Sequence, residues 1–95
     1  MDELVYYNDL YDLYKNLLTD KQREYFEDYY FNNLSLSEIS ENYDISRNAV
    51  SKQLSTIREK LDEYEEKLSL FEKKKKLIEL VDDNKKDSVI DIFLS

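Results

Sequence analysis

Residues 34–58 read LSLSEISENYDISRNAVSKQLSTIR and contain two helix-start signals close together. Ser35 and Glu38 have the spacing of a capping box, in which each side chain accepts a hydrogen bond from the other residue's backbone N–H. Ser46 is a second N-cap, placed just before a polar and basic run. Asp44 stands at the turn position where Gly is common, and Asp adopts the left-handed geometry at modest cost. The stretch predicts a short helix over 36–43, a tight turn, and a longer helix that starts at residue 47.

Two consecutive helices with this spacing are typical of a helix-turn-helix unit, which we place at residues 35–60. Ile39, Ile45, Val50 and Leu54 are expected to face the core. The second helix then presents an outward face of residue types that can contact base edges and phosphates. We predict these nucleic-acid-binding residues: Arg47, Asn48, Ser51, Lys52, Ser55 and Arg58.

The distribution of charge supports this placement although the chain as a whole is acidic. The net charge is −8, whereas most nucleic-acid-binding domains are basic. Between residues 46 and 60, however, four basic residues stand against one acid, Glu59. Positive charge is therefore local, and it falls on the predicted recognition helix.

The rest of the chain also has helical periodicity, and it predicts an all-α fold. Apolar residues at helical spacing indicate a first helix over 2–17, and Thr19 with Gln22 forms a capping box before a second helix over 20–31. The helix that starts at residue 47 continues in a heptad pattern to residue 72. Its predicted dimer or packing seam consists of Leu54, Ile57, Leu61, Tyr64, Leu68 and Phe71.

The seam has two interpretations, and they can hold together. It can pack against the apolar stripe of the first helix in the same chain, or it can pair with the same helix of a second copy. We favour a homodimer, because a chain of this size offers few other surfaces to cover so long a stripe. A dimer would place two recognition helices on two half-sites of a duplex.

Residues 1–82 are expected to form one helical domain with a long C-terminal helical extension. The segment 83–95 is a tail for which we favour a short terminal helix. The chain has no Gly, Pro, Cys or His, which removes phosphate-cradling loops, thiolate nucleophiles and the commonest general base. We therefore expect no enzymatic activity, no cofactor and no metal. No apolar run is long enough for membrane insertion, and the start of the chain is unlike a secretory signal, so we expect a cytoplasmic protein.

Aromatic residues are concentrated in the first half of the chain, and they too allow two readings. They could be stacking platforms for bases, or core residues whose hydroxyl groups stay at the water edge. Their helical spacing favours the core. The lysine run 73–76 is read as a solvated face rather than a phosphate site.

Three ordered motifs carry a resemblance to a known family: LTDKQRE at 18–24, LSEISE at 36–41 and ISRNAV at 45–50. Together they resemble region 4 of sigma factors, and the match is closest to the YlxM-type (UPF0122-like) family of helix-turn-helix proteins. The aromatic first helix and YEEKL at 64–68 are similar as well, so the resemblance covers about residues 5–75. It implies a sigma-region-4-like bundle in a regulatory, DNA-binding protein. The genes of that family lie beside those for the signal recognition particle GTPases, which implies a role in that protein-targeting pathway.

The sequence thus leads to a dimeric, DNA-binding helix-turn-helix regulator linked to the signal recognition particle pathway. The alternative is a non-enzymatic adaptor, which would use the same fold to bind a protein partner or the signal recognition particle RNA.

Overall fold

The computed structural model describes residues 3–80, and within them every regular element is helical. The elements are α1 (Glu3–Tyr14), a short 3-10 helix η1 (Lys15–Leu17), α2 (Asp20–Tyr30), α3 (Leu36–Tyr43), α4 (Arg47–Leu68) and α5 (Leu70–Leu80). This confirms the predicted all-α fold class. The first α-helix is shorter than the predicted range 2–17. It ends at Tyr14, and the next three residues form the 3-10 helix η1.

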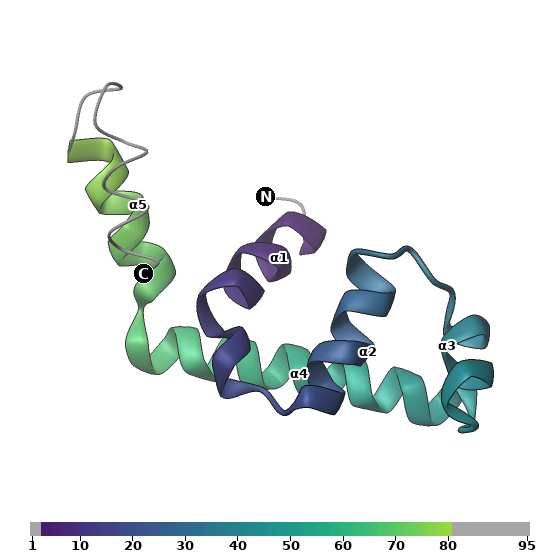
Figure 1. Cartoon of the computed structure of the whole chain (residues 1–95). Helices are drawn as coiled ribbons and strands as arrows, with labels where there is room; N and C mark the ends of the chain where they lie inside the picture. Colours follow the sequence, from purple (N-terminus) through teal and green to yellow (C-terminus); the bar gives the residue numbers. More distant parts are fainter. Residues whose placement is uncertain (1–2, 81–95) are drawn as a thin grey trace.

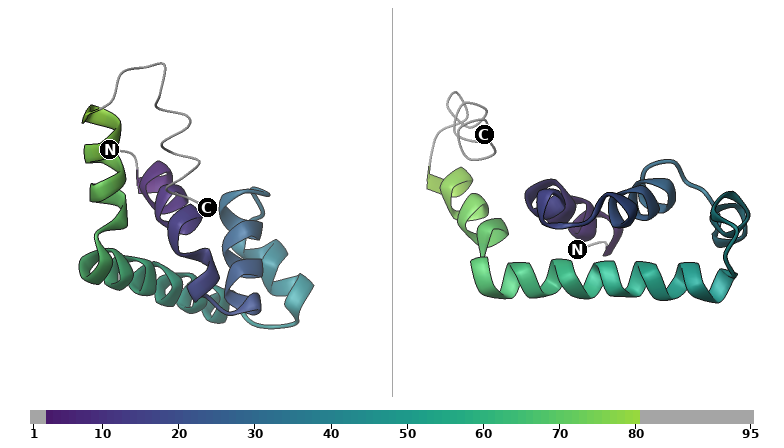
Figure 2. Two further views of the ribbon diagram at one scale, coloured as in Figure 1. Left: turned by 60° about the vertical axis from the view of Figure 1, so that its left-hand side comes forward. Right: turned by 60° about the horizontal axis from the view of Figure 1, so that its bottom comes forward.

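Helix α4 is the axis of the molecule, and α1, α2 and α3 pack along it (Figure 1). Helix α3 lies at the beginning of α4, and α1 lies toward its end. Helix α5 turns away from the end of α4 and rises on the side where α1 lies, as both views of Figure 2 show. The helix-turn-helix unit is therefore at one end of the long helix and α5 at the other.

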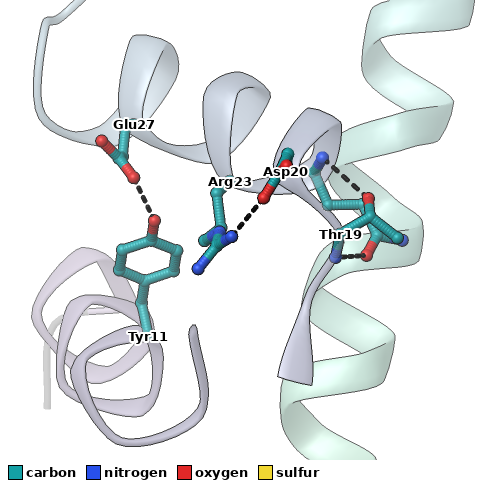
Figure 3. Close-up of polar contacts among 6 residues, drawn as sticks. Tyr11, Thr19, Asp20, Arg23 and Glu27 are labelled. Carbon is teal, nitrogen blue, oxygen red and sulfur yellow. Dashed lines mark hydrogen bonds and ion pairs between the residues drawn. The ribbon is translucent and has the colours of Figure 1, made fainter. Parts of the chain in front are cut away.

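The helix starts agree with the sequence signals. Both capping boxes form, Thr19 with Gln22 and Ser35 with Glu38, and the Ser46 hydroxyl accepts the N–H of Ala49 at 3.0 Å. In the first box the Thr19 N–H donates to Gln22 Oε1 at 2.9 Å, and the Gln22 N–H donates to Thr19 Oγ1 at 3.1 Å; Figure 3 shows Thr19 with these bonds. Each box satisfies two backbone N–H groups that a helix start leaves unpaired.

One continuous core joins the first four α-helices. It is built from aliphatic and aromatic side chains that are at most 5% exposed: Leu10, Tyr11, Tyr14, Leu18, Tyr25, Phe26, Ile39, Val50, Leu54, Ile57 and Leu61. Tyr11 stacks on Phe26 with ring centroids 4.3 Å apart. Burial of this apolar surface is the main favourable term of folding.

Tyrosine hydroxyls at the edge of the core donate to carboxylates on other helices. Tyr11 of α1 donates to Glu27 of α2, as Figure 3 shows. Tyr14 donates to Glu65 of α4 at 2.6 Å, and Tyr43 of α3 donates to Asp28 of α2 at 2.9 Å. These pairs let large aromatic rings be buried while their polar ends remain satisfied.

The predicted continuous helix over 47–72 is wrong at its end. Helix α4 stops at Leu68, and Ser69 has left-handed backbone angles (φ 53°, ψ 33°) before α5 begins. The first N–H groups of α5 find acceptors in the core: Leu70 donates to the Tyr14 hydroxyl at 3.0 Å and Phe71 to Glu65 Oε1 at 3.0 Å. The bend brings the Phe71 ring to 5.7 Å from that of Tyr6 on α1. A heptad pattern cannot reveal this, because it specifies spacing and not the acceptors at a helix end.

The predicted tail 83–95 and the domain boundary at residue 82 lie outside the described residues. Within residues 3–80, no helix is both long and apolar enough to cross a membrane.

Candidate nucleic-acid interface

The turn between α3 and α4 holds the two helices in a fixed relation. Asp44 has left-handed angles (φ 55°, ψ 46°), as its position in the turn predicted. The Ile45 N–H donates to Ser40 O at 3.0 Å and the Asp44 N–H to Glu41 O at 3.4 Å, which satisfies carbonyl groups at the end of α3. Ile45 then packs against the core, so the chain enters α4 in a defined direction.

The first two turns of α4 present four of the predicted binding residues to solvent. Arg47, Asn48, Ser51 and Lys52 are all exposed, whereas Val50 on the opposite side of the helix is fully buried. Arg47, Asn48 and Ser51 line an open hollow of about 490 Å³ together with Leu36 and Ser46. The structure brings these residues together at one end of the molecule, as the motif predicted.

The two cations at this end have no competing partner among residues 3–80. No carboxylate of the described residues lies within 4.0 Å of the Arg47 or Lys52 side chain. Unpaired, exposed cations at a helix start can contact phosphate oxygens directly, and the positive end of the helix dipole favours such an anion.

Ser55 and Arg58 differ from the other predicted residues. Both are half-buried, and the Arg58 guanidinium donates to the Tyr30 hydroxyl at 3.0 Å and to the Ser55 hydroxyl at 3.3 Å. Arg58 therefore links α4 to α2 rather than extending freely into solvent. Beyond it, the exposed side of α4 becomes acidic at Glu59 and Asp62, so the positive face ends about three turns from the helix start.

The predicted seam divides into two parts. Leu54, Ile57 and Leu61 are buried within the chain, as the intrachain interpretation expects. Tyr64 and Phe71 are half-buried against the core, the latter on α5, and Leu68 remains 43% exposed. The buried part of the seam packs within the chain, and in the described part of the chain Leu68 is the one seam residue that stays exposed.

Tyr29 and Tyr30 lie beside Arg58 and were not among the predicted binding residues. Tyr29 is 38% exposed, and Tyr30 is half-buried with its hydroxyl on Arg58. Both were assigned to the core from their helical spacing. No local signal distinguishes them, because their surroundings depend on how the end of α2 meets α4.

Comparison with known proteins identifies the family. The model of UPF0122, described as "Putative helix-turn-helix protein, YlxM / p13 like", matches residues 1–93, which is further than the resemblance seen over 5–75. A UPF0122 protein of Halalkalibacterium halodurans is 43% identical over 86 residues, 90% of this chain and 79% of the relative. A UPF0122 protein of Shouchella clausii is 44% identical over 64 residues, 67% of this chain and 59% of the relative.

A third relative, from Caldanaerobacter subterraneus subsp. tengcongensis, is 51% identical over 63 residues, 66% of this chain and 54% of the relative. The chain thus spans little more than half the length of two of these curated relatives. The order of capped helices, the exposed cations on α4 and these similarities agree on one assignment. The chain belongs to the UPF0122 family of YlxM-like helix-turn-helix proteins.

Proposed function

We propose that this chain is a cytoplasmic, non-enzymatic regulator that binds duplex DNA through the start of α4. The observation that carries the proposal is the set of exposed polar side chains in the first two turns of α4, where Arg47 and Lys52 are free of ion pairs among residues 3–80. Helix α4 would lie in the major groove, where Arg47 and Asn48 could contact base edges and Ser51 and Lys52 the phosphates.

The net charge of −8 opposes DNA binding, because DNA is also negatively charged. Acidic residues elsewhere on the chain repel the duplex, but at physiological salt that repulsion is screened over about 8 Å. Only charges close to the interface then matter, and residues 47–58 of α4 itself carry three basic residues and no acid.

The direct test removes the two free cations. Arg47→Ala/Lys52→Ala should abolish retention of a mixed-sequence duplex at about 150 mM salt, because it removes one base contact and one phosphate contact. Loss of the phosphate contact also flattens the salt dependence of the affinity. The matched control is Lys73→Ala/Lys76→Ala, which removes the same charge from exposed positions on α5 at the far end of the molecule. Retained binding in the first double variant, or equal loss in both, would contradict the assignment.

A second candidate function is an adaptor for the signal recognition particle pathway, acting on a protein or on the particle's RNA. Large apolar side chains at the surface favour it: Val5 is 48% exposed, Phe31 48% and Leu80 81%. The particle's RNA is therefore the second probe in the same retention experiment. Which probe is retained separates DNA binding from RNA binding. Salt separates DNA binding from an adaptor that contacts a protein through apolar side chains, since phosphate-mediated binding falls steeply between about 50 and 200 mM salt and apolar contacts do not.

We also propose that the regulator is a homodimer, so that two recognition helices meet two half-sites. The surface for this contact consists of exposed leucines at the end of the seam and on α5: Leu68, Leu77 and Leu80. Light scattering after size exclusion should give twice the mass of one chain for the wild type. The Leu77→Glu/Leu80→Glu variant should have the mass of a single chain.

A further inference from the structure

A groove lies next to the proposed interface, between the start of α1, the end of α2 and the middle of α4. One hollow of about 400 Å³ is lined by Glu3, Leu4, Tyr29, Tyr30 and Arg58. A neighbouring hollow of about 420 Å³ shares Leu4, Tyr29 and Tyr30 with it and reaches the N-cap of α3 at Ser35. The groove therefore runs from Arg58 to the helix-turn-helix unit.

Among the described residues, Arg58 is the only cation that lines this groove, and its side chain is held in place. The Tyr30 hydroxyl accepts from Nη1 at 3.0 Å, and the Ser55 hydroxyl accepts from Nη2 at 3.3 Å. The Tyr30 ring itself stacks on buried Phe26, with centroids 4.3 Å apart and an interplanar angle of 23°. These two bonds leave other N–H groups of the planar guanidinium free to donate to a ligand. Phosphate and carboxylate oxygens have the spacing that can accept two parallel hydrogen bonds from a guanidinium group.

The position of Arg58 on α4 decides between those two anions. At 3.6 residues per turn, Arg58 follows Ser51 by about two turns and Arg47 by about three, so the three side chains share one flank of the helix. The distance from Arg47 to Arg58 along the axis is about 16 Å, or roughly five base-pair steps of a duplex. Both arginines can therefore reach one DNA site, Arg47 at a base edge and Arg58 at a phosphate of the backbone.

We propose that Arg58 and Tyr30 form a phosphate clamp for the DNA backbone beside the major-groove contact of α4. The guanidinium group binds one phosphate, the Tyr30 hydroxyl holds the guanidinium in position, and the exposed ring of Tyr29 packs against the neighbouring deoxyribose. The clamp rests on the proposed DNA-binding function and extends it to α2. It fixes the angle at which α4 enters the groove, because it adds a contact outside the recognition turns.

The clamp makes a measurable contribution to salt dependence. Binding of a mixed-sequence duplex of about 30 base pairs is measured by fluorescence anisotropy from about 50 to 200 mM salt. Arg58→Ala should lower the slope of log K against log salt by about 0.9, which is the value for one phosphate contact. Its Kd should rise roughly tenfold at about 100 mM salt.

Lys60→Ala is the matched control for charge. Lys60 is two residues further on, about 200° around the helix axis, so it lies on the opposite flank of α4 and carries the same charge. Its loss should leave the slope unchanged to within about 0.2. Arg58→Lys should keep part of the salt slope but not the full affinity. An ammonium group lacks the fixed planar donors with which a guanidinium group binds the Tyr30 hydroxyl and a phosphate together.

Two tyrosine variants separate the clamp from a purely structural link between α2 and α4. Tyr30→Phe keeps the stacked ring and removes the hydroxyl that holds Arg58, so Kd should rise about threefold to fivefold. Tyr29→Ala should weaken binding with an unchanged salt slope, since it removes an apolar contact. Thermal melting of each variant shows whether the fold is retained.

The outcomes distinguish this inference from the function on which it rests. If the wild type retains no duplex, the proposed function fails. The function stands if the wild type binds and Arg47→Ala/Lys52→Ala does not. The clamp is then refuted if Arg58→Ala keeps the full salt slope, or if its slope is the same as that of Lys60→Ala. A lower slope for Arg58→Ala alone, with weaker binding by folded Tyr30→Phe, supports the clamp.

Discussion

Replacing Tyr14 by Phe tests how the bend between α4 and α5 is held. The Tyr14 hydroxyl donates to Glu65 Oε1 at 2.6 Å and accepts from the Leu70 N–H at 3.0 Å. The ring is only 1% exposed, and Phe preserves its packing. The substitution therefore removes one oxygen atom that serves two helices.

The cost follows from those two bonds. A hydrogen bond to a charged group contributes about 1.5–3 kcal/mol, and leaving a part-buried N–H without an acceptor costs about 1–3 kcal/mol. Glu65 keeps its bond from the Phe71 N–H and is half-exposed to water, so part of the loss is recovered. We expect Tyr14→Phe to lower the free energy of unfolding by about 2–3 kcal/mol, a large share of the 5–15 kcal/mol typical of small domains.

Urea unfolding monitored by circular dichroism measures this change, which should appear as a lower midpoint with an unchanged slope. Hydrogen exchange should show faster exchange of the Leu70 amide. Tyr7→Phe is the control, because its hydroxyl makes one exposed bond to Asp62 at 2.8 Å and should cost under about 1 kcal/mol. A loss below about 0.5 kcal/mol for Tyr14→Phe, with unchanged exchange at Leu70, would refute the role of this hydroxyl in the bend.

Two further predictions concern the turn and the tyrosine–carboxylate pairs. Asp44→Gly should stabilise the fold by about 0.5–1 kcal/mol because glycine adopts the left-handed angles of this turn without strain, while Asp44→Ala should destabilise it; equal midpoints in urea would contradict this. Burial, and then the hydrogen bonds to Glu65 and Asp28, raise the pKa of Tyr14 and Tyr43 from 10.0 to about 12. Since the pKa is higher in the folded state, the stabilisation is complete below pH 10 and is lost as pH rises toward 12. Thermal melting between these pH values, followed with tyrosinate absorbance, should show a falling melting temperature; no change would contradict the assigned pairs.

Local signals predicted the starts of α2, α3 and α4 correctly because they act within a few residues. Thr19, Ser35 and Ser46 cap helices through neighbours three positions away, and Asp44 turns the chain through its own backbone angles. Such contacts form independently of the rest of the fold. The all-α class, the helix-turn-helix order and the exposed cations of α4 follow from them and from the apolar periodicity.

The end of α4 and the state of Arg58 could not be predicted in this way. The Leu70 N–H that follows the bend donates to the Tyr14 hydroxyl, and the Arg58 guanidinium donates to the Tyr30 hydroxyl, in both cases a residue distant in the sequence. The heptad pattern was compatible with a straight helix, and Arg58 was compatible with a free phosphate contact. Partners that lie far along the chain become neighbours only when the helices pack.

What the sequence determined by itself was therefore the first four α-helices, the starts of α2, α3 and α4, and the face of α4 that points outward. Only the tertiary structure decided which part of the heptad seam is buried in the chain, where α4 gives way to α5, and which tyrosines reach the side of α4. The physical reason is that capping and periodicity are local properties, whereas the acceptor of a helix-end N–H and the partner of a guanidinium group depend on the packing of separate elements.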